Sequence, residues 1–150
     1  MPCRRAIPTR VPRAPSSPIA DPVIHARGPF EVKVTPVPGG EANGVGRMKV
    51  EKTFRGELRG TSQFEMLTGM GSVKGSGAYV AIERVEGELA GRKGTFLLQH
   101  AGTMDRGAQS LSITVVPDSG TGELEGLVGR MRIAIAADGA HSYDLEYSLP

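Results

Sequence analysis

Apolar and polar residues alternate along most of this chain, and Gly, Pro, Asn or Asp residues separate the alternating runs. A period of two is typical of β-strands with one buried face, and no stretch keeps the 3.6-residue period of an amphipathic helix. The chain is therefore predicted to be all-β. Eight strands are expected, at Phe30–Thr35, Gly46–Glu57, Thr61–Gly71, Gly77–Ala90, Thr95–Gly102, Gln109–Val116, Glu123–Ala137 and His141–Leu149.

Short segments rich in turn-forming residues connect these runs, among them Asp105-Arg106-Gly107 and Asp138-Gly139. Consecutive strands on short hairpin loops favour an antiparallel meander, and closing the meander removes its two exposed edges. Glycines within the strands, such as Gly87 and Gly129, allow the bends that closure requires. We expect a closed antiparallel barrel of eight strands, with a β-sandwich as the alternative architecture.

The first 28 residues differ from the rest of the chain. They hold six of the eleven prolines and show no apolar periodicity, so burial cannot offset their ordering entropy. We therefore expect a disordered tail over residues 1–28 and a barrel domain over residues 29–150. No run of 18 apolar residues occurs anywhere, so no transmembrane helix is expected.

Charge is also unevenly distributed. The first 28 residues carry five Arg against one Asp, whereas the remaining 122 carry 13 Lys or Arg and 15 Asp or Glu. A nucleic-acid-binding domain normally presents a basic face with aromatic residues for stacking, and only 5% of this chain is aromatic. Nucleic acid is not an expected partner. The single cysteine, Cys3, excludes an internal disulfide framework.

The alternation also predicts which side chains face the interior. In the strand Gly77–Ala90 the pattern is ambiguous, because Ala78, Val80 and Ile82 share one face while Tyr79, Ala81, Glu83 and Val85 share the other. For the other strands the predicted core is Met48, Val50, Phe54, Phe64, Met66, Met70, Leu111, Ile113, Val115, Met131, Ile133, Ile135, Tyr143, Leu145 and Tyr147.

Four segments together resemble a bacterial family of unknown function, the domain-of-unknown-function 3224 (DUF3224) family. They are Tyr79–Gly87, Gly94–His100, Val115–Gly122 and His141–Tyr147. The resemblance spans about residues 28–150 and implies an allene oxide cyclase-like barrel in a cytoplasmic bacterial protein. It implies no reaction, because a shared barrel does not transfer chemistry.

The domain contains two histidines, His100 and His141, each on a strand and each on its apolar face. With Glu83 they are the candidate catalytic residues, because histidine titrates near neutrality and burial raises the pKa of a carboxyl group toward that range. The alternative is that each histidine is hydrogen-bonded structurally at a barrel end.

Tyr79, Gln99 and Tyr143 are the expected ligand-binding residues. No metal site is expected, because the histidines and carboxylates lack a close ligand spacing such as His-x-His. No cofactor is expected either.

The most favoured function is binding of a small apolar or amphipathic molecule inside the barrel. One alternative is an isomerase or cyclase that uses the acid and base residues, and another is an oligomeric scaffold whose barrel is filled by its own side chains. Phe96, Leu97 and Leu98 are apolar on both faces of their strand, which suggests a subunit contact and hence a homo-oligomer. A void of roughly 300 Å³ or more would favour binding or catalysis over the scaffold.

Overall fold

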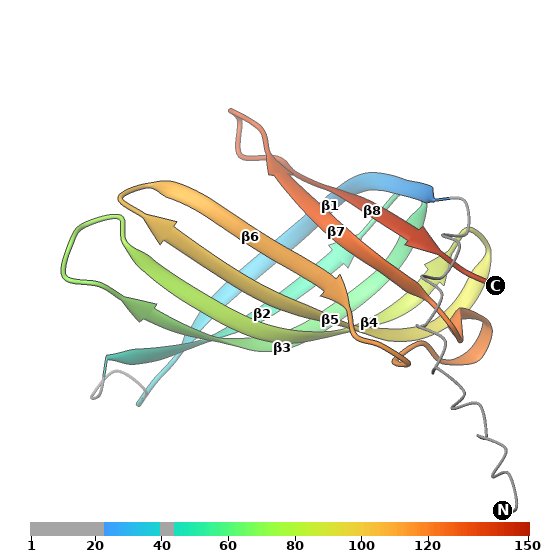
Figure 1. The fold of residues 1–150 in the computed structure, drawn as a ribbon, viewed down its shortest axis with the longest axis horizontal. Helices are drawn as coiled ribbons and strands as arrows, with labels where there is room; N and C mark the ends of the chain where they lie inside the picture. The colour runs from blue at the N-terminus through green and yellow to red at the C-terminus, as the bar shows by residue number, and fades with distance from the viewer. Residues whose placement is uncertain (1–22, 40–43) are drawn as a thin grey trace, which may run out of the picture.

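Eight antiparallel strands close into a barrel, because β8 pairs back onto β1 (Figure 1). The computed structural model describes residues 23–39 and 44–150. The closed barrel confirms the predicted fold and excludes the sandwich. The strands are β1 (Ile24–Val37), β2 (Val45–Phe54), β3 (Leu58–Met70), β4 (Gly77–Leu89), β5 (Arg92–Asp105), β6 (Ala108–Val115), β7 (Val128–Ile135) and β8 (His141–Ser148).

The first strand is longer than predicted. β1 begins at Ile24, and its first seven residues pair with β8 while the residues from Phe30 onward pair with β2. Residues 24–28, predicted as tail, therefore belong to the barrel. Partners more than 110 residues away in β8 hold this segment in the sheet. The rest of the predicted disordered tail, residues 1–22, lies outside the described residues.

The seventh strand is shorter than predicted. In place of one strand over residues 123–137, a 3₁₀ turn at Gly122–Leu124 (η2) precedes β7. Gly122 and Gly126 adopt positive φ angles, which interrupt an extended chain. Leu124 and Leu127 are fully buried and plug one end of the barrel. Among residues 23–39 and 44–150, no helix is long and apolar enough to cross a membrane.

The end with η2 is packed, and we call this part the closed half. It also contains the β2–β3 and β4–β5 turns. Gly60, Gly87 and Gly94 lie side by side across β3, β4 and β5, and a Cβ atom at any of them would overlap a backbone carbonyl of a neighbouring segment. These glycines let the backbones approach closely here. The core cluster comprises Ala26, Phe30, Phe54, Leu58, Val85, Leu89, Phe96, Leu98, Ile113, Val115, Leu124, Leu127, Met131, Tyr143, Leu145 and Tyr147.

The opposite part, the open half, ends at the β3–β4, β5–β6 and β7–β8 connections (Figure 1). Three residues predicted to be core lie here and remain exposed: Met70 by 68%, Ile135 by 61% and Leu111 by 45%. The alternation placed them correctly on the cavity side, since all three line the cavity described below, but the prediction that they are buried is wrong. The side chains in this half leave a space inside the barrel.

The wall of the barrel is weakest between β6 and β7. These strands pair only through Ile113 with Met131 and Thr114 with Arg130, both close to the closed half. Toward the open half the strands diverge (Figure 1), leaving a seam between residues 108–112 and residues 132–135. Each side of the seam still pairs with its outer neighbour, β5 or β8.

The structure also resolves the two possible faces of β4. Ala81, Glu83 and Val85 are buried inside the barrel, whereas Val80 and Ile82 are exposed on its outer surface. The inner face of this strand nevertheless holds the charged side chain of Glu83. The reason is the set of polar groups that neighbouring strands present to Glu83, described next.

Candidate functional site

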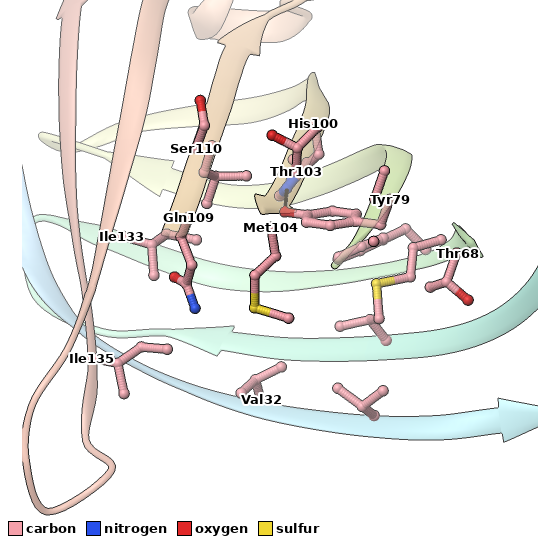
Figure 2. A pocket seen from close by; sticks show the side chains of 18 of the residues that line it. Val32, Thr68, Tyr79, His100, Thr103, Met104, Gln109, Ser110, Ile133 and Ile135 are labelled. Carbon is pink, nitrogen blue, oxygen red and sulfur yellow. Dashed lines mark hydrogen bonds between the residues drawn. The ribbon is translucent and has the colours of Figure 1, made fainter. Parts of the chain in front are cut away.

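The open half encloses a cavity of about 480 Å³ that opens to solvent at the mouth of the barrel. Its wall is mainly apolar, and its polar side chains come from several strands. Figure 2 shows Tyr79 beside His100, with Met104 and Gln109 projecting into the space before them. The principal lining side chains are Phe30, Val32, Val34, Val50, Lys52, Phe64, Met66, Thr68, Met70, Tyr79, His100, Thr103, Met104, Gln109, Ser110, Leu111, Ile133, Ile135 and His141.

A buried polar network separates this cavity from the closed half. At its centre is Glu83, whose exposed fraction is 0%. Its carboxylate accepts hydrogen bonds from Lys52 Nζ at 3.1 Å, Ser62 Oγ at 2.6 Å and His100 Nε2 at 2.6 Å. Within the described residues, no buried side-chain nitrogen or oxygen lacks a hydrogen-bond partner. Because all of its members are satisfied, the network stabilises a defined arrangement of the cavity floor.

Glu83 is held as a carboxylate. Burial raises the pKa of a carboxyl group, but the hydrogen bond from His100, the charge of Lys52 and the hydrogen bond from Ser62 together outweigh it, so the pKa of Glu83 is lowered. The sequence-based expectation of a raised pKa is therefore wrong. The error arose because the three partners come from β2, β3 and β5 and are not apparent from β4 alone.

The ionised carboxylate determines the direction of the hydrogen bonds along the network. A carboxylate can only accept, so His100 Nε2 carries the proton that it donates to Glu83. In the neutral ring His100 Nδ1 is then an acceptor, and the Tyr79 hydroxyl, 3.1 Å away, donates to it. Burial and the charge of Glu83 raise the pKa of Tyr79 to about 12, so this hydroxyl keeps its proton at neutral pH.

The sequence analysis missed two residues of this network, Ser62 and the charged Lys52. Its Nζ lies 5.2 Å from the ring centroid of Phe30, 5.2 Å from that of Phe64 and 5.8 Å from that of Phe54. Aromatic faces attract a desolvated cation, which helps to offset its burial. A signal was present, because Lys52 continues the alternating series of Val50 and Phe54 and is the one charged residue on that apolar face.

Three of the six predicted site residues converge, namely Glu83, His100 and Tyr79. His141 does not join them. Its ring packs against Phe30 at 5.2 Å and lines the cavity wall, and within the described residues it forms no hydrogen bond to Glu83 or His100. The catalytic roles of Glu83, His100 and His141 remain predictions.

Gln99 and Tyr143 lie away from the cavity. Gln99 is exposed on the outer face of β5, because it alternates with the inward-facing Leu98 and His100. Tyr143 is buried in the closed half, where its hydroxyl accepts from the backbone N–H of Leu58 at 2.9 Å and donates to the carbonyl of Arg55 at 2.6 Å. Neither side chain can contact a molecule inside the cavity in this structure, and Tyr143 instead fixes the β2–β3 turn.

The polar groups of the site do not form a metal centre in the described part of the chain. Over residues 23–39 and 44–150, no group of three or more His, Cys, Asp or Glu side chains is placed to hold a metal ion. The chemistry that the site offers is hydrogen bonding at Tyr79 and Lys52, at the inner end of an otherwise apolar cavity.

Comparisons with known proteins agree with this architecture. Residues 26–147 match the profile of a family described as "Protein of unknown function (DUF3224)". A crystal structure of a protein with unknown function from the DUF3224 family, from Shewanella oneidensis MR-1, shares 48% sequence identity and superposes with a TM-score of 0.78. The match covers 85% of this chain and 98% of that chain. No curated protein matches the chain. The predicted family resemblance is confirmed.

Proposed function

The chain belongs to the DUF3224 family of proteins of unknown function, and from the geometry of its site we propose that the barrel binds one small amphipathic molecule in its open half. The observation that carries the proposal is a solvent-accessible cavity of about 480 Å³ with apolar walls and a polar floor. This volume lies within the range of roughly 300–1,000 Å³ that is usual for small-molecule sites.

The apolar walls supply the driving force. Val34, Met70, Leu111 and Ile135 all line the cavity, yet all are substantially exposed. An apolar molecule lying against them removes that surface from water, which contributes roughly 25 cal/mol for each Å² of apolar surface buried. Met66, Met70 and Met104 add flexible thioether side chains that adapt to an irregular shape.

The polar floor supplies orientation. Tyr79 and Lys52 line the inner end of the cavity, whereas the mouth is mainly aliphatic. A molecule with one polar end therefore binds with that end inward. The filled-barrel scaffold accounts only for the closed half, where the core is packed.

Displacement of a fluorescent apolar probe such as Nile red tests this function. Leu111→Arg places a cation at the cavity mouth and should weaken Nile red binding at least about tenfold. The matched control is Val128→Arg, because Val128 is also an exposed aliphatic residue on a strand but does not line the cavity. Equal binding by both variants would refute the proposal, and native mass spectrometry of freshly purified protein should show a co-purifying small molecule.

A second candidate function is proton transfer of the isomerase or cyclase type. The series Glu83, His100 and Tyr79 favours it, because a carboxylate orients an imidazole whose other nitrogen contacts a hydroxyl at the cavity. In this role the Tyr79 oxygen would take a proton from the carbon beside a ligand carbonyl as its own proton passes to His100 Nδ1, and reversal of both transfers would return to that carbon a proton exchanged with solvent. Deuterium incorporation beside the carbonyl of an added apolar ketone, followed by NMR, should fall in Tyr79→Phe, and an equal rate in both proteins would exclude this role.

Two further expectations belong to this proposal. A homo-oligomer would use the outer face of β3 and β4, where Leu67, Val80 and Ile82 are exposed. Two copies can meet there without opposing like charges at these three positions. Light scattering of the wild type and of Val80→Lys tests it, since the substitution should shift an oligomer toward monomers.

The cytoplasmic location that the resemblance implied is tested by cell fractionation.

A further inference from the structure

We propose that the molecule bound in the cavity is uncharged, with a hydroxyl or carbonyl oxygen at its inner end, and that the corresponding acid or amine is rejected. This inference rests on the proposed function and specifies the class of molecule. It follows from the charges that the barrel encloses around its floor.

The charges at the floor balance. Lys52 is the single Lys, Arg, Asp or Glu side chain among the residues that line the cavity, as far as the structure describes them. Its ammonium lies 3.1 Å from the carboxylate of Glu83, and both side chains are almost completely excluded from water. Lys52 and Glu83 have opposite charges, so this pair adds no net charge to the floor, and both ions already have a partner.

A ligand carboxylate gains little binding free energy at this floor. Any carboxylate close enough to bind Lys52 also approaches Glu83, so repulsion from one partner largely cancels attraction to the other. The cost of removing the incoming charge from water is then not repaid. An ammonium group meets the converse difficulty, because Lys52 repels it while Glu83 is already saturated by three donors.

A neutral oxygen avoids both costs. The Tyr79 hydroxyl donates to His100 and keeps lone pairs that can accept from a ligand hydroxyl. Lys52 has three N–H donors, of which one is directed at Glu83, so its ammonium can donate to a carbonyl or hydroxyl oxygen. His100 is not available, since both of its ring nitrogens are occupied.

Matched ten-carbon probes test the inference. Decanol, decanoate and decylamine have the same chain and differ in the charge of the head group, and each is titrated at pH 8 against protein loaded with Nile red. Decanol should displace the dye at a concentration about 100-fold lower than decanoate or decylamine.

Ionised probes also prefer water for reasons unrelated to this protein, so a charge variant is needed. Glu83→Gln leaves the floor with a net positive charge and should narrow or invert the difference between decanol and decanoate. The double variant Lys52→Met/Glu83→Gln is neutral again and should return to the wild-type order of preference. Circular dichroism verifies that each variant is folded. If Glu83→Gln does not fold, Ser110→Lys adds the unbalanced positive charge to the cavity wall and should narrow the same difference.

The outcomes separate this inference from the proposed function. If neither Nile red nor any of the three probes binds the wild type, the proposed function fails. If Nile red binds but decanoate displaces it as readily as decanol, the binding function stands and the neutral-ligand inference is overturned. A double variant that favours decanoate, or a folded Glu83→Gln that keeps the full wild-type preference, also overturns it.

Discussion

The two halves of this barrel are built from the same eight strands, but their inward-facing side chains have different roles. In the closed half, Phe96, Leu98 and Leu124 belong to one core cluster and are almost completely excluded from water. In the open half, Leu111 and Ile135 occupy equivalent inward positions but remain exposed around a cavity. The stability of the fold is therefore expected to depend mainly on one half and its binding function on the other.

The boundary between the halves is polar. Glu83 and its three donors lie where the packed core ends and the cavity begins. A satisfied buried network costs little, but removing one member leaves another unpaired. This layer thus couples the two halves, and it is the place where substitutions should affect both stability and binding.

The largest expected effect is therefore at this boundary. Lys52→Met leaves the Glu83 carboxylate buried without its cation, and we expect a loss of about 3–5 kcal/mol in the free energy of unfolding. Urea denaturation measures the change. The double variant Lys52→Met/Glu83→Gln removes both charges and should recover most of the loss, and a double variant as unstable as the single one would contradict this account.

The comparison of the halves is tested directly by truncating one residue in each. Leu124→Ala should cost about 2–5 kcal/mol of unfolding free energy, because it opens a cavity in the packed end. Ile135→Ala, at the open end, should change it by less than about 0.5 kcal/mol. Ile135→Ala should instead weaken Nile red binding, since Ile135 lines the cavity. Similar unfolding costs for both variants would abolish the distinction between the halves.

Tyr143, which is buried, and Tyr79, which is half-buried, should also behave differently. Tyr143→Phe leaves the Leu58 N–H without its acceptor in the closed half and should destabilise the fold by about 1–3 kcal/mol. Tyr79→Phe should cost less stability but change the affinity for decanol, because Tyr79 lines the cavity. Thermal melts and probe titrations on both variants separate the two effects. The reverse pattern would show that the binding site does not lie in the open half.

The smallest effect concerns pH. Because the pKa of Glu83 is lower in the folded protein than its ordinary value of 4.5, its contribution to stability is complete above that value and is lost as the pH falls through the lower folded pKa. Urea denaturation between pH 6 and pH 3 should show a steeper loss for the wild type than for Glu83→Gln. Asp144 and Glu146, whose pKa values are also lowered, contribute alike to both proteins, so equal slopes would exclude Glu83 as a source.

The local sequence was sufficient to predict the strands and, for most of them, which side chains point into the barrel. Alternation depends only on neighbours two residues apart, so the inward positions of Val50, Ile113 and Leu145 could be read directly. Whether an inward side chain is buried depends on what lies across the barrel. For that reason Met70 and Ile135 were placed on the correct face but with the wrong exposure.

The residues of the site could be predicted less well from the local sequence. On β4 the alternation allowed either Val80 and Ile82 or Glu83 to face the interior. Glu83 faces inward because Lys52, Ser62 and His100, from three other strands, donate hydrogen bonds to it. Cross-strand register brings those groups together, and no local pattern encodes it. Similarly, the start of β1 depends on pairing with β8, whose partner residues are distant in the chain.

The seam between β6 and β7 determines how freely the circumference of the barrel can change. Two residue pairs hold these strands together, and both lie toward the closed half. Widening or narrowing of the open half along this line would leave the β5–β6 and β7–β8 pairs intact. For the proposed ligand, such a boundary would fit molecules of different width, and selectivity would then depend more on the chemistry of the cavity floor than on the diameter of its mouth.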